Sequence, residues 1–96
     1  MKVYISGPIT GHEKTYFDEF KTLEKSLIES GAEVINPCTL PHNHGHTYEE
    51  FMKEDLIAML TYCDKIIMMQ GWETSKGALD EKRIAEICGF EVLYVS

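Results

Sequence analysis

Two carboxylates, Asp55 and Glu81, fall within the apolar faces of two predicted helices. Over residues 48–60, Asp55 stands four residues after and four before apolar positions of a stripe made of Phe51, Met52, Leu56, Met59 and Leu60. Over residues 75–88, Glu81 stands three after and four before apolar positions of a stripe made of Ala78, Ile84, Ala85 and Cys88. Residues at these spacings share one side of a helix, so both carboxylates are expected on the buried side. Because desolvating an ionised carboxylate is costly, a chain that does this on two successive helices is expected to use the pair as a site.

A single carboxylate of this kind could equally lie at the margin of its apolar stripe. Two carboxylates in one part-apolar crevice, however, have their pKa values pushed apart, so that one is ionised while the other keeps its proton. Such a pair suits a reaction in which one carboxylate attacks and the other moves a proton.

Length and composition limit the classes of protein to consider. The chain has 96 residues, 44% of them hydrophobic and 26% charged, as expected for one small soluble domain over residues 1–96. Its formal net charge of −7 argues against binding to duplex DNA or to an anionic membrane, because phosphate contacts need clustered Lys and Arg. A single phosphate held by backbone amides at a helix start remains compatible with this charge.

The cysteines and the N-terminus predict a cytoplasmic protein. Cys38, Cys63 and Cys88 are odd in number, widely spaced and without a C-x-x-C pair, which is typical of a reducing compartment. Residues 1–10 do not resemble a signal peptide, and no run approaches 18 apolar residues.

Apolar periodicity alternates between the strand type and the helix type along the chain. Strands are predicted at residues 2–6, 32–35, 64–69 and 90–95, and helices at residues 13–30, 47–61 and 75–88. This alternation predicts a Rossmann- or flavodoxin-like α/β three-layer sandwich with a four-stranded parallel sheet of order 2-1-3-4. Ligands of such sheets bind beyond the carboxyl ends of strands 1 and 3.

The segment that follows the first predicted strand has the composition of a ligand-binding turn. Residues 6–11 (S-G-P-I-T-G) place Gly7 and Gly11 around a turn, where backbone N–H groups can approach a ligand closely. An ordinary βα turn has the same composition. The segment is not G-x-G-x-x-G, so a dinucleotide fingerprint is not supported.

The segment before the third predicted helix suits an anion. Within residues 71–81 (G-W-E-T-S-K-G-A-L-D-E), Ser75 and Gly77 offer a hydroxyl and free amides at the positive end of the helix, although an ordinary N-cap is the alternative. Trp72 could stack on a base or sugar, cover the core, or contact a second subunit.

Residues 38–46 (C-T-L-P-H-N-H-G-H) carry three alternating histidines, His42, His44 and His46. They lack the spacing of a dependable zinc site, so no metal is expected. A loop that covers the crevice and touches substrate through one histidine is favoured, and a solvated loop is the alternative.

Several short motifs together resemble the nucleoside 2-deoxyribosyltransferase-like superfamily. They are Y-I-S-G-P-I-T-G at residues 4–11, D-L at 55–56, C-D at 63–64 and S-x-G-x-x-x-E at 75–81. The superfamily includes nucleoside deoxyribosyltransferases and N-glycosidases that cleave 2′-deoxynucleoside 5′-monophosphates. The chain looks most like small phage and bacterial members that share G-W-x-x-S-x-G-A, and the resemblance covers nearly its whole length.

This resemblance implies roles for particular residues. Glu81 would be the nucleophile that attacks the anomeric carbon, and Asp55 would assist proton transfer to the leaving base. Ser75 stands where transferases of free nucleosides have Asp and the monophosphate-cleaving branch has Ser, which implies a phosphate ligand. The residues implied to bind substrate are Tyr4, Ser6, Gly7, Ile9, Gly11, Trp72, Ser75 and Gly77.

The chain also departs from the superfamily pattern. Thr10 stands where the monophosphate glycosidases carry Arg, and the C-terminal extension through which the transferases complete a neighbouring subunit's site is not found. No cofactor is implied.

The sequence therefore predicts cleavage of the N-glycosidic bond of a nucleotide or deoxynucleotide 5′-monophosphate, by hydrolysis or by base transfer. The alternative is a non-catalytic module that senses or sequesters a nucleotide, and a third hypothesis is an assembly protein. A homodimer or higher homo-oligomer with a helical interface is expected, because Tyr16, Phe17 and Phe20 form an aromatic stripe too large for one narrow sheet to cover.

Overall fold

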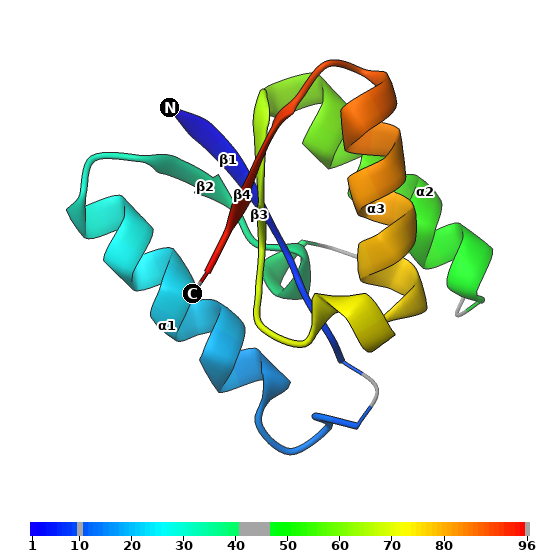
Figure 1. Ribbon diagram of the computed structural model, residues 1–96. Helices are drawn as coiled ribbons and strands as arrows, with labels where there is room; N and C mark the ends of the chain where they lie inside the picture. The colour runs from blue at the N-terminus through cyan, green and yellow to red at the C-terminus, as the bar shows by residue number, and fades with distance from the viewer. Residues whose placement is uncertain (10, 41–46, 96) are drawn as a thin grey trace.

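The protein folds as a four-stranded parallel sheet between two layers of helices (Figure 1). The computed structural model describes residues 1–9, 11–40 and 47–95. Its strands are β1 (Lys2–Ser6), β2 (Glu33–Ile35), β3 (Lys65–Met68) and β4 (Glu91–Tyr94), in the order β2-β1-β3-β4. The α/β architecture and the strand order predicted from the sequence are confirmed.

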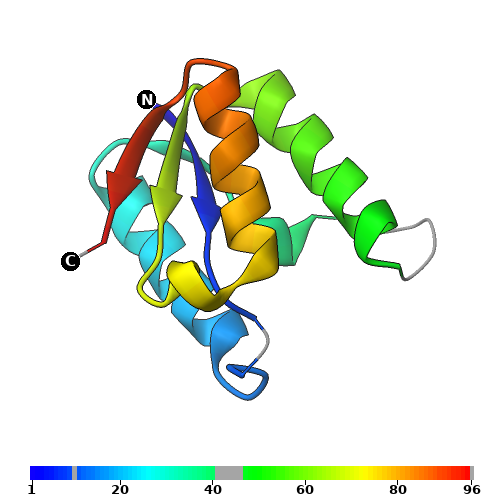
Figure 2. The same ribbon diagram turned by 45° about the vertical axis from the view of Figure 1, so that its right-hand side comes forward.

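The helices divide unequally between the two faces of the sheet. Helix α1 (Tyr16–Glu29) covers one face, and α2 (Tyr48–Tyr62) and α3 (Lys76–Ile87) lie side by side on the other (Figures 1 and 2). Two short 3-10 turns that the sequence did not predict, η1 (Pro37–Thr39) and η2 (Trp72–Thr74), follow β2 and β3. The carboxyl ends of β1, β2 and β3 therefore lead into the segments in which ligand-binding residues are expected.

Strand β1 is buried on both faces. Successive side chains of a strand point to opposite faces, so Val3 and Ile5 pack under α1 while Tyr4 and Ser6 face α2 and α3. All four side chains are almost fully buried. In register, Ser6 of β1 lies beside Met68 of β3, so the two central strands end together at the same edge of the sheet.

Side-chain caps fix where α2 and α3 begin. The Thr47 hydroxyl accepts a hydrogen bond from the Glu50 amide, and the Ser75 hydroxyl accepts one from the Ala78 amide, each at 3.2 Å. Ser75 is thus the N-cap that the sequence predicted. The first helix starts at Tyr16, later than predicted; before it, residues 12–15 form a turn in which the His12 carbonyl accepts from the amides of Thr15 and Tyr16.

The structure corrects part of the predicted buried stripes. Phe51 and Leu60 of α2 are exposed rather than buried, and Ala58 takes a buried place instead. Phe51 points into a cavity, which explains its exposure. Cys88 is also exposed because it caps the C-terminus of α3, beyond the last turn that packs on the sheet.

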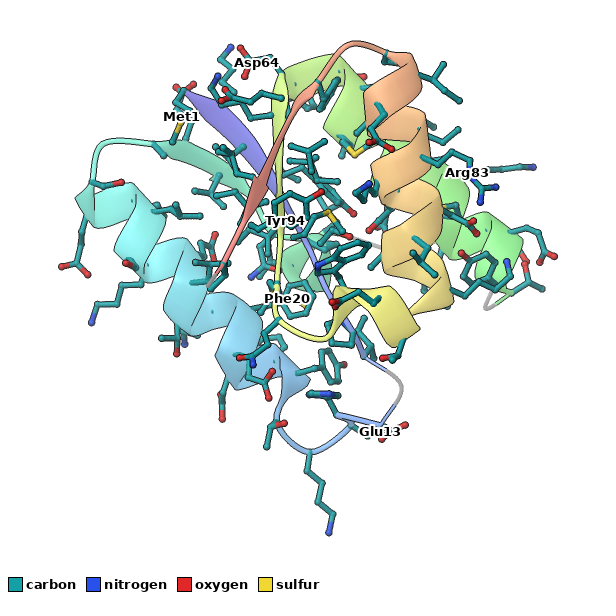
Figure 3. All side chains as sticks on the ribbon, in the orientation of Figure 1. Met1, Glu13, Phe20, Asp64, Arg83 and Tyr94 are labelled. Carbon is teal, nitrogen blue, oxygen red and sulfur yellow. The ribbon has the colours of Figure 1, made fainter. Side chains whose placement is uncertain are left out.

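The aromatic stripe of α1 is less exposed than the sequence suggested. Phe20 is fully buried between α1 and the sheet (Figure 3), and Tyr16 meets it edge-on with 6.5 Å between ring centroids. Phe17 alone of the three is largely exposed, at 48%. The predicted homo-oligomer therefore loses most of this support and stays a prediction. Within the residues described here, none of the helices combines the length and the apolar character needed to cross a membrane.

Just after β1, the backbone at Gly7 lies close to Met69, and this contact can be tested. A Cβ added at Gly7 would lie 2.7 Å from the Cβ of Met69, an atom fixed by its own backbone. We expect Gly7→Ala to lower the free energy of unfolding by about 1–3 kcal/mol through this overlap.

Gly77→Ala is the matched control, because the nearest atoms to its added Cβ are 3.9 Å away. In a helix this change should raise stability by up to about 1 kcal/mol. Urea denaturation of both variants measures the difference, and equal effects would refute this account of the packing at Gly7.

Candidate functional site

A cavity of about 740 Å³ lies beyond the carboxyl ends of β1, β2 and β3. Asp55 from α2 and Glu81 from α3 both line it, so the structure brings the two carboxylates into one crevice as predicted. Four further predicted site residues also line this cavity: Gly7, Ile9, Ser75 and Gly77. The roles of these residues stay predictions.

Glu81 is held by two hydroxyl groups of β1. The Tyr4 hydroxyl donates to Oε2 and the Ser6 hydroxyl donates to Oε1, both at 2.6 Å. Because Tyr4 and Ser6 are two residues apart on one strand, they point from the same face of the sheet toward α3. Both oxygens of Glu81 are therefore satisfied although the residue is only 6% exposed.

The pKa of Glu81 is raised to about 7, mainly by burial and also by the nearby charges of Asp55 and Asp80. The hydrogen bonds from Ser6 and Tyr4 act in the opposite direction, since they favour the ionised form. Burial and the charge of Glu81 also raise the pKa of Tyr4 well above its usual value, so Tyr4 stays a donor. Glu81 can thus exchange between carboxylate and carboxylic acid near neutral pH.

Apolar and aromatic side chains form much of the cavity wall. Six of these residues were not expected at the site from the sequence: Tyr16, Phe20, Cys38, Tyr48, Phe51 and Met52. Phe51 could have been found, because it lies one helical turn before Asp55. Met52 and Tyr48, three and seven residues before Asp55 on the same helix, could have been found by the same spacing. Tyr16, Phe20 and Cys38 come from other elements, and only packing brings them to the cavity.

Four predicted substrate-binding residues are not among those that line the cavity: Tyr4 and Ser6, which contact Glu81, and Trp72 and Gly11. Trp72 packs against Tyr94 of β4, with 5.7 Å between ring centroids, and Lys82 lies over the indole at 5.4 Å. Trp72 thus packs against the core, in line with one of its alternatives, and its role in stacking on substrate stays a prediction. Gly11 is exposed, and its amide donates to both carboxylate oxygens of Glu13 at 3.0 Å, so it does not line this cavity and its substrate role stays a prediction.

The histidine loop and its possible metal cannot be located in the same way, because His42, His44 and His46 lie outside the described residues. In the part of the chain that is described, no group of three or more metal-ligating side chains gathers.

Comparison with known proteins places the chain in a family and a fold. The model of the family described as "Domain of unknown function (DUF4406)" matches residues 1–94. No curated protein matches. Among solved structures, a 2-deoxyribosyltransferase from the bacterium Bacillus psychrosaccharolyticus superposes with a TM-score of 0.73 at 21% identity, over 98% of this chain and 71% of that one.

A 2-deoxyribosyltransferase from Leishmania mexicana superposes with a TM-score of 0.72 at 20% identity. The match covers 99% of this chain but 63% of that protein, so this chain corresponds to only part of the length of either enzyme. At these identities the likeness shows the fold, and the resemblance read from the sequence motifs is confirmed at that level.

The raised pKa of Glu81 makes the stability of the protein depend on pH. Between its ordinary value of 4.5 and about 7, the folded state binds more protons at Glu81 than the unfolded state does. The free energy of unfolding should therefore fall as pH rises through this window, by up to about 3 kcal/mol from this group.

Glu81→Gln has no titratable group at this position, so its free energy of unfolding minus that of the wild type should rise between pH 5 and pH 8. Urea denaturation at both pH values measures this. A constant difference between the two proteins would show that Glu81 titrates normally.

Proposed function

This chain belongs to the DUF4406 family, and we propose that it cleaves the N-glycosidic bond of a nucleotide or deoxynucleotide 5′-monophosphate, with Glu81 as the nucleophile. The observation that carries the proposal is the pair of carboxylates in one cavity, one of them buried and held by two hydroxyls. A buried carboxylate that served packing alone would gain nothing from a cavity shared with a second carboxylate.

The proposed reaction follows a retaining route. A carboxylate oxygen of Glu81 attacks the anomeric carbon as the bond to the base breaks, and the base leaves with a proton supplied through Asp55. This forms a glycosyl ester of Glu81. A water molecule or a second base then attacks the same carbon and releases Glu81, while Asp55 takes up the proton of the attacking group.

Tyr4 and Ser6 prepare Glu81 for attack in this scheme. Their hydrogen bonds fix the direction of the carboxylate and stabilise its charge against the cost of burial. Both residues contact Glu81 and neither lines the cavity, so their role in this scheme is to orient the nucleophile rather than to bind substrate directly.

Two groups of residues that line the cavity suit different parts of a nucleotide. Aromatic side chains such as Tyr16 and Phe51 offer flat apolar surface to a base. Ser75 and Gly77 lie at the N-terminus of α3, where helix amides and the positive end of the dipole favour an anion. This arrangement supports a 5′-monophosphate over a free nucleoside.

Glu81→Ala should abolish base release by the protein. We expect a loss of at least about a thousandfold, since the variant lacks the attacking group. The measurement is chromatography of free base after incubation with a panel of nucleosides and nucleoside 5′-monophosphates. Glu86→Ala is the control, because Glu86 lies on the exposed side of the same helix.

Circular dichroism checks that both variants are folded. Release of base by Glu81→Ala at a rate near wild type would remove the assignment of the nucleophile. Binding of nucleotides without any release by the wild type would instead support the non-catalytic module.

Ser75→Ala should reduce the preference for 5′-monophosphates over the matching nucleosides. We expect calorimetry to show a preference of about tenfold in the wild type and little in the variant, because one charge-assisted hydrogen bond is lost. The substitution also removes the N-cap of α3, which costs about 1 kcal/mol of stability.

Thr47→Ala is the matched control, since it removes the equivalent cap from α2. It should cost similar stability and leave the preference unchanged. Equal affinity of the wild-type protein for nucleotide and nucleoside would remove the phosphate role of Ser75.

A further inference from the structure

One polar cluster ties α2 to α3 at the rim of the cavity. The Tyr48 hydroxyl, in the first turn of α2, donates to Oδ2 of Asp80 at 2.8 Å. The Lys76 ammonium donates to the same oxygen at 3.2 Å and lies 4.0 Å from the centroid of the Tyr48 ring. Three residues from the two helices that carry Asp55 and Glu81 thus meet at one carboxylate.

The Tyr48 ring also lies close to bare backbone of α3. A Cβ placed on Gly77 would be 3.9 Å from Cε1 and from the hydroxyl oxygen of Tyr48. Tyr48, Lys76 and Gly77 all line the cavity, so this contact forms part of its wall. Figure 2 shows the first turns of α2 and α3 at the same end of the molecule, toward which the strands point.

The two ends of α2 are held in different ways. Near its C-terminal end, Met59 is buried against the sheet and α3, and Ala58 is buried as well. Near its N-terminal end, Tyr48 and Phe51 are partly exposed. Apolar packing therefore holds one end of the helix, while the placement of the other end depends more on the polar cluster.

Asp55 lies between these two ends, on the same side of α2 as Tyr48 and two turns away. Asp80 directly precedes Glu81 on α3. We propose that Tyr48 is a positioning residue for the reaction proposed above, because its hydrogen bond to Asp80 clamps α2 to α3 and so fixes the separation of Asp55 from Glu81. The inference rests on the proposed function.

The chemistry of the clamp suits a permanent contact. Burial and the bond to Asp80 raise the pKa of Tyr48, so the hydroxyl keeps its proton over the working range of pH. The same bond and that of Lys76 lower the pKa of Asp80, which stays an ionised acceptor. Hydrogen bonds to a charged acceptor are stronger than neutral ones, and the cation over the ring adds to them.

The first test is kinetic. Tyr48→Phe keeps the ring and loses the hydroxyl, and we expect kcat to fall about tenfold with KM changed less than about twofold, as for a lost alignment of reacting groups. Tyr62→Phe is the control, because Tyr62 is exposed at the opposite end of the same helix.

A double-mutant cycle identifies the partner. Asp80→Ala should lower kcat as Tyr48→Phe does, and the double variant should be no slower than either single one, since both remove the same bond. Asp80→Asn keeps an acceptor oxygen and should retain most of the rate. Additive losses in the double variant would overturn the clamp.

The second test does not need activity. Cys38 lines the cavity, whereas Cys63 caps the far end of α2. The two thiols are otherwise matched, since both are half-buried and burial raises the pKa of each to about 11. Alkylation by iodoacetamide, followed at each cysteine by mass spectrometry of the peptides, therefore separates opening of the cavity from general unfolding.

We expect Tyr48→Phe to raise the ratio of Cys38 to Cys63 alkylation at least about threefold, and Tyr62→Phe to leave it unchanged. An unchanged ratio in Tyr48→Phe would overturn the inference even if activity fell. A raised ratio in a protein that releases no base would support the clamp and count against the proposed function instead.

Discussion

The two hydrogen bonds that β1 donates to Glu81 are the interaction on which the rest of the site depends. A carboxylate with 6% exposure in an apolar layer would be costly without partners, and Tyr4 and Ser6 satisfy both of its oxygens. They can do so only because β1 lies in the centre of a parallel sheet with α3 packed on one face. The order of the strands and the docking of α3 are thus conditions for the chemistry of Glu81.

The same interaction helps to set the charge state of Glu81. Burial alone would keep Glu81 protonated, while two donors alone would keep it ionised at any ordinary pH. The balance places its pKa at about 7, where a small change in the surroundings shifts the charge. In a chain with a net charge of −7, the nearby carboxylates of Asp55 and Asp80 also raise the pKa of Glu81, because their charges oppose its ionisation.

A small chain holds this arrangement with few elements. Its four strands and three long helices superpose on enzymes of which it covers 71% and 63%. Both carboxylates come from the two helices on one face of the sheet, and α1 on the other face contributes Tyr16 and Phe20 to the apolar wall of the cavity. The cavity thus uses both helical layers, and its polar groups gather where the strands end, as expected for parallel sheets.

The sequence by itself determined the features that follow from local periodicity. Alternation of strand and helix patterns gave the order of the elements, Ser75 marked the start of α3, and helical spacing put Asp55 and Glu81 on buried sides. These inferences need only residues a few positions apart, because backbone geometry fixes which neighbours share a face.

Only the tertiary structure decided which distant groups meet. Tyr4 and Ser6 are 77 and 75 positions from Glu81, and Tyr48 is 32 positions from Asp80, so no local pattern pairs them. Trp72 and Gly11 had suitable types and positions, yet packing against Tyr94 and a turn closed by Glu13 took them away from the cavity. Contacts of this range depend on how the helices dock on the sheet, which side-chain packing sets and local spacing does not.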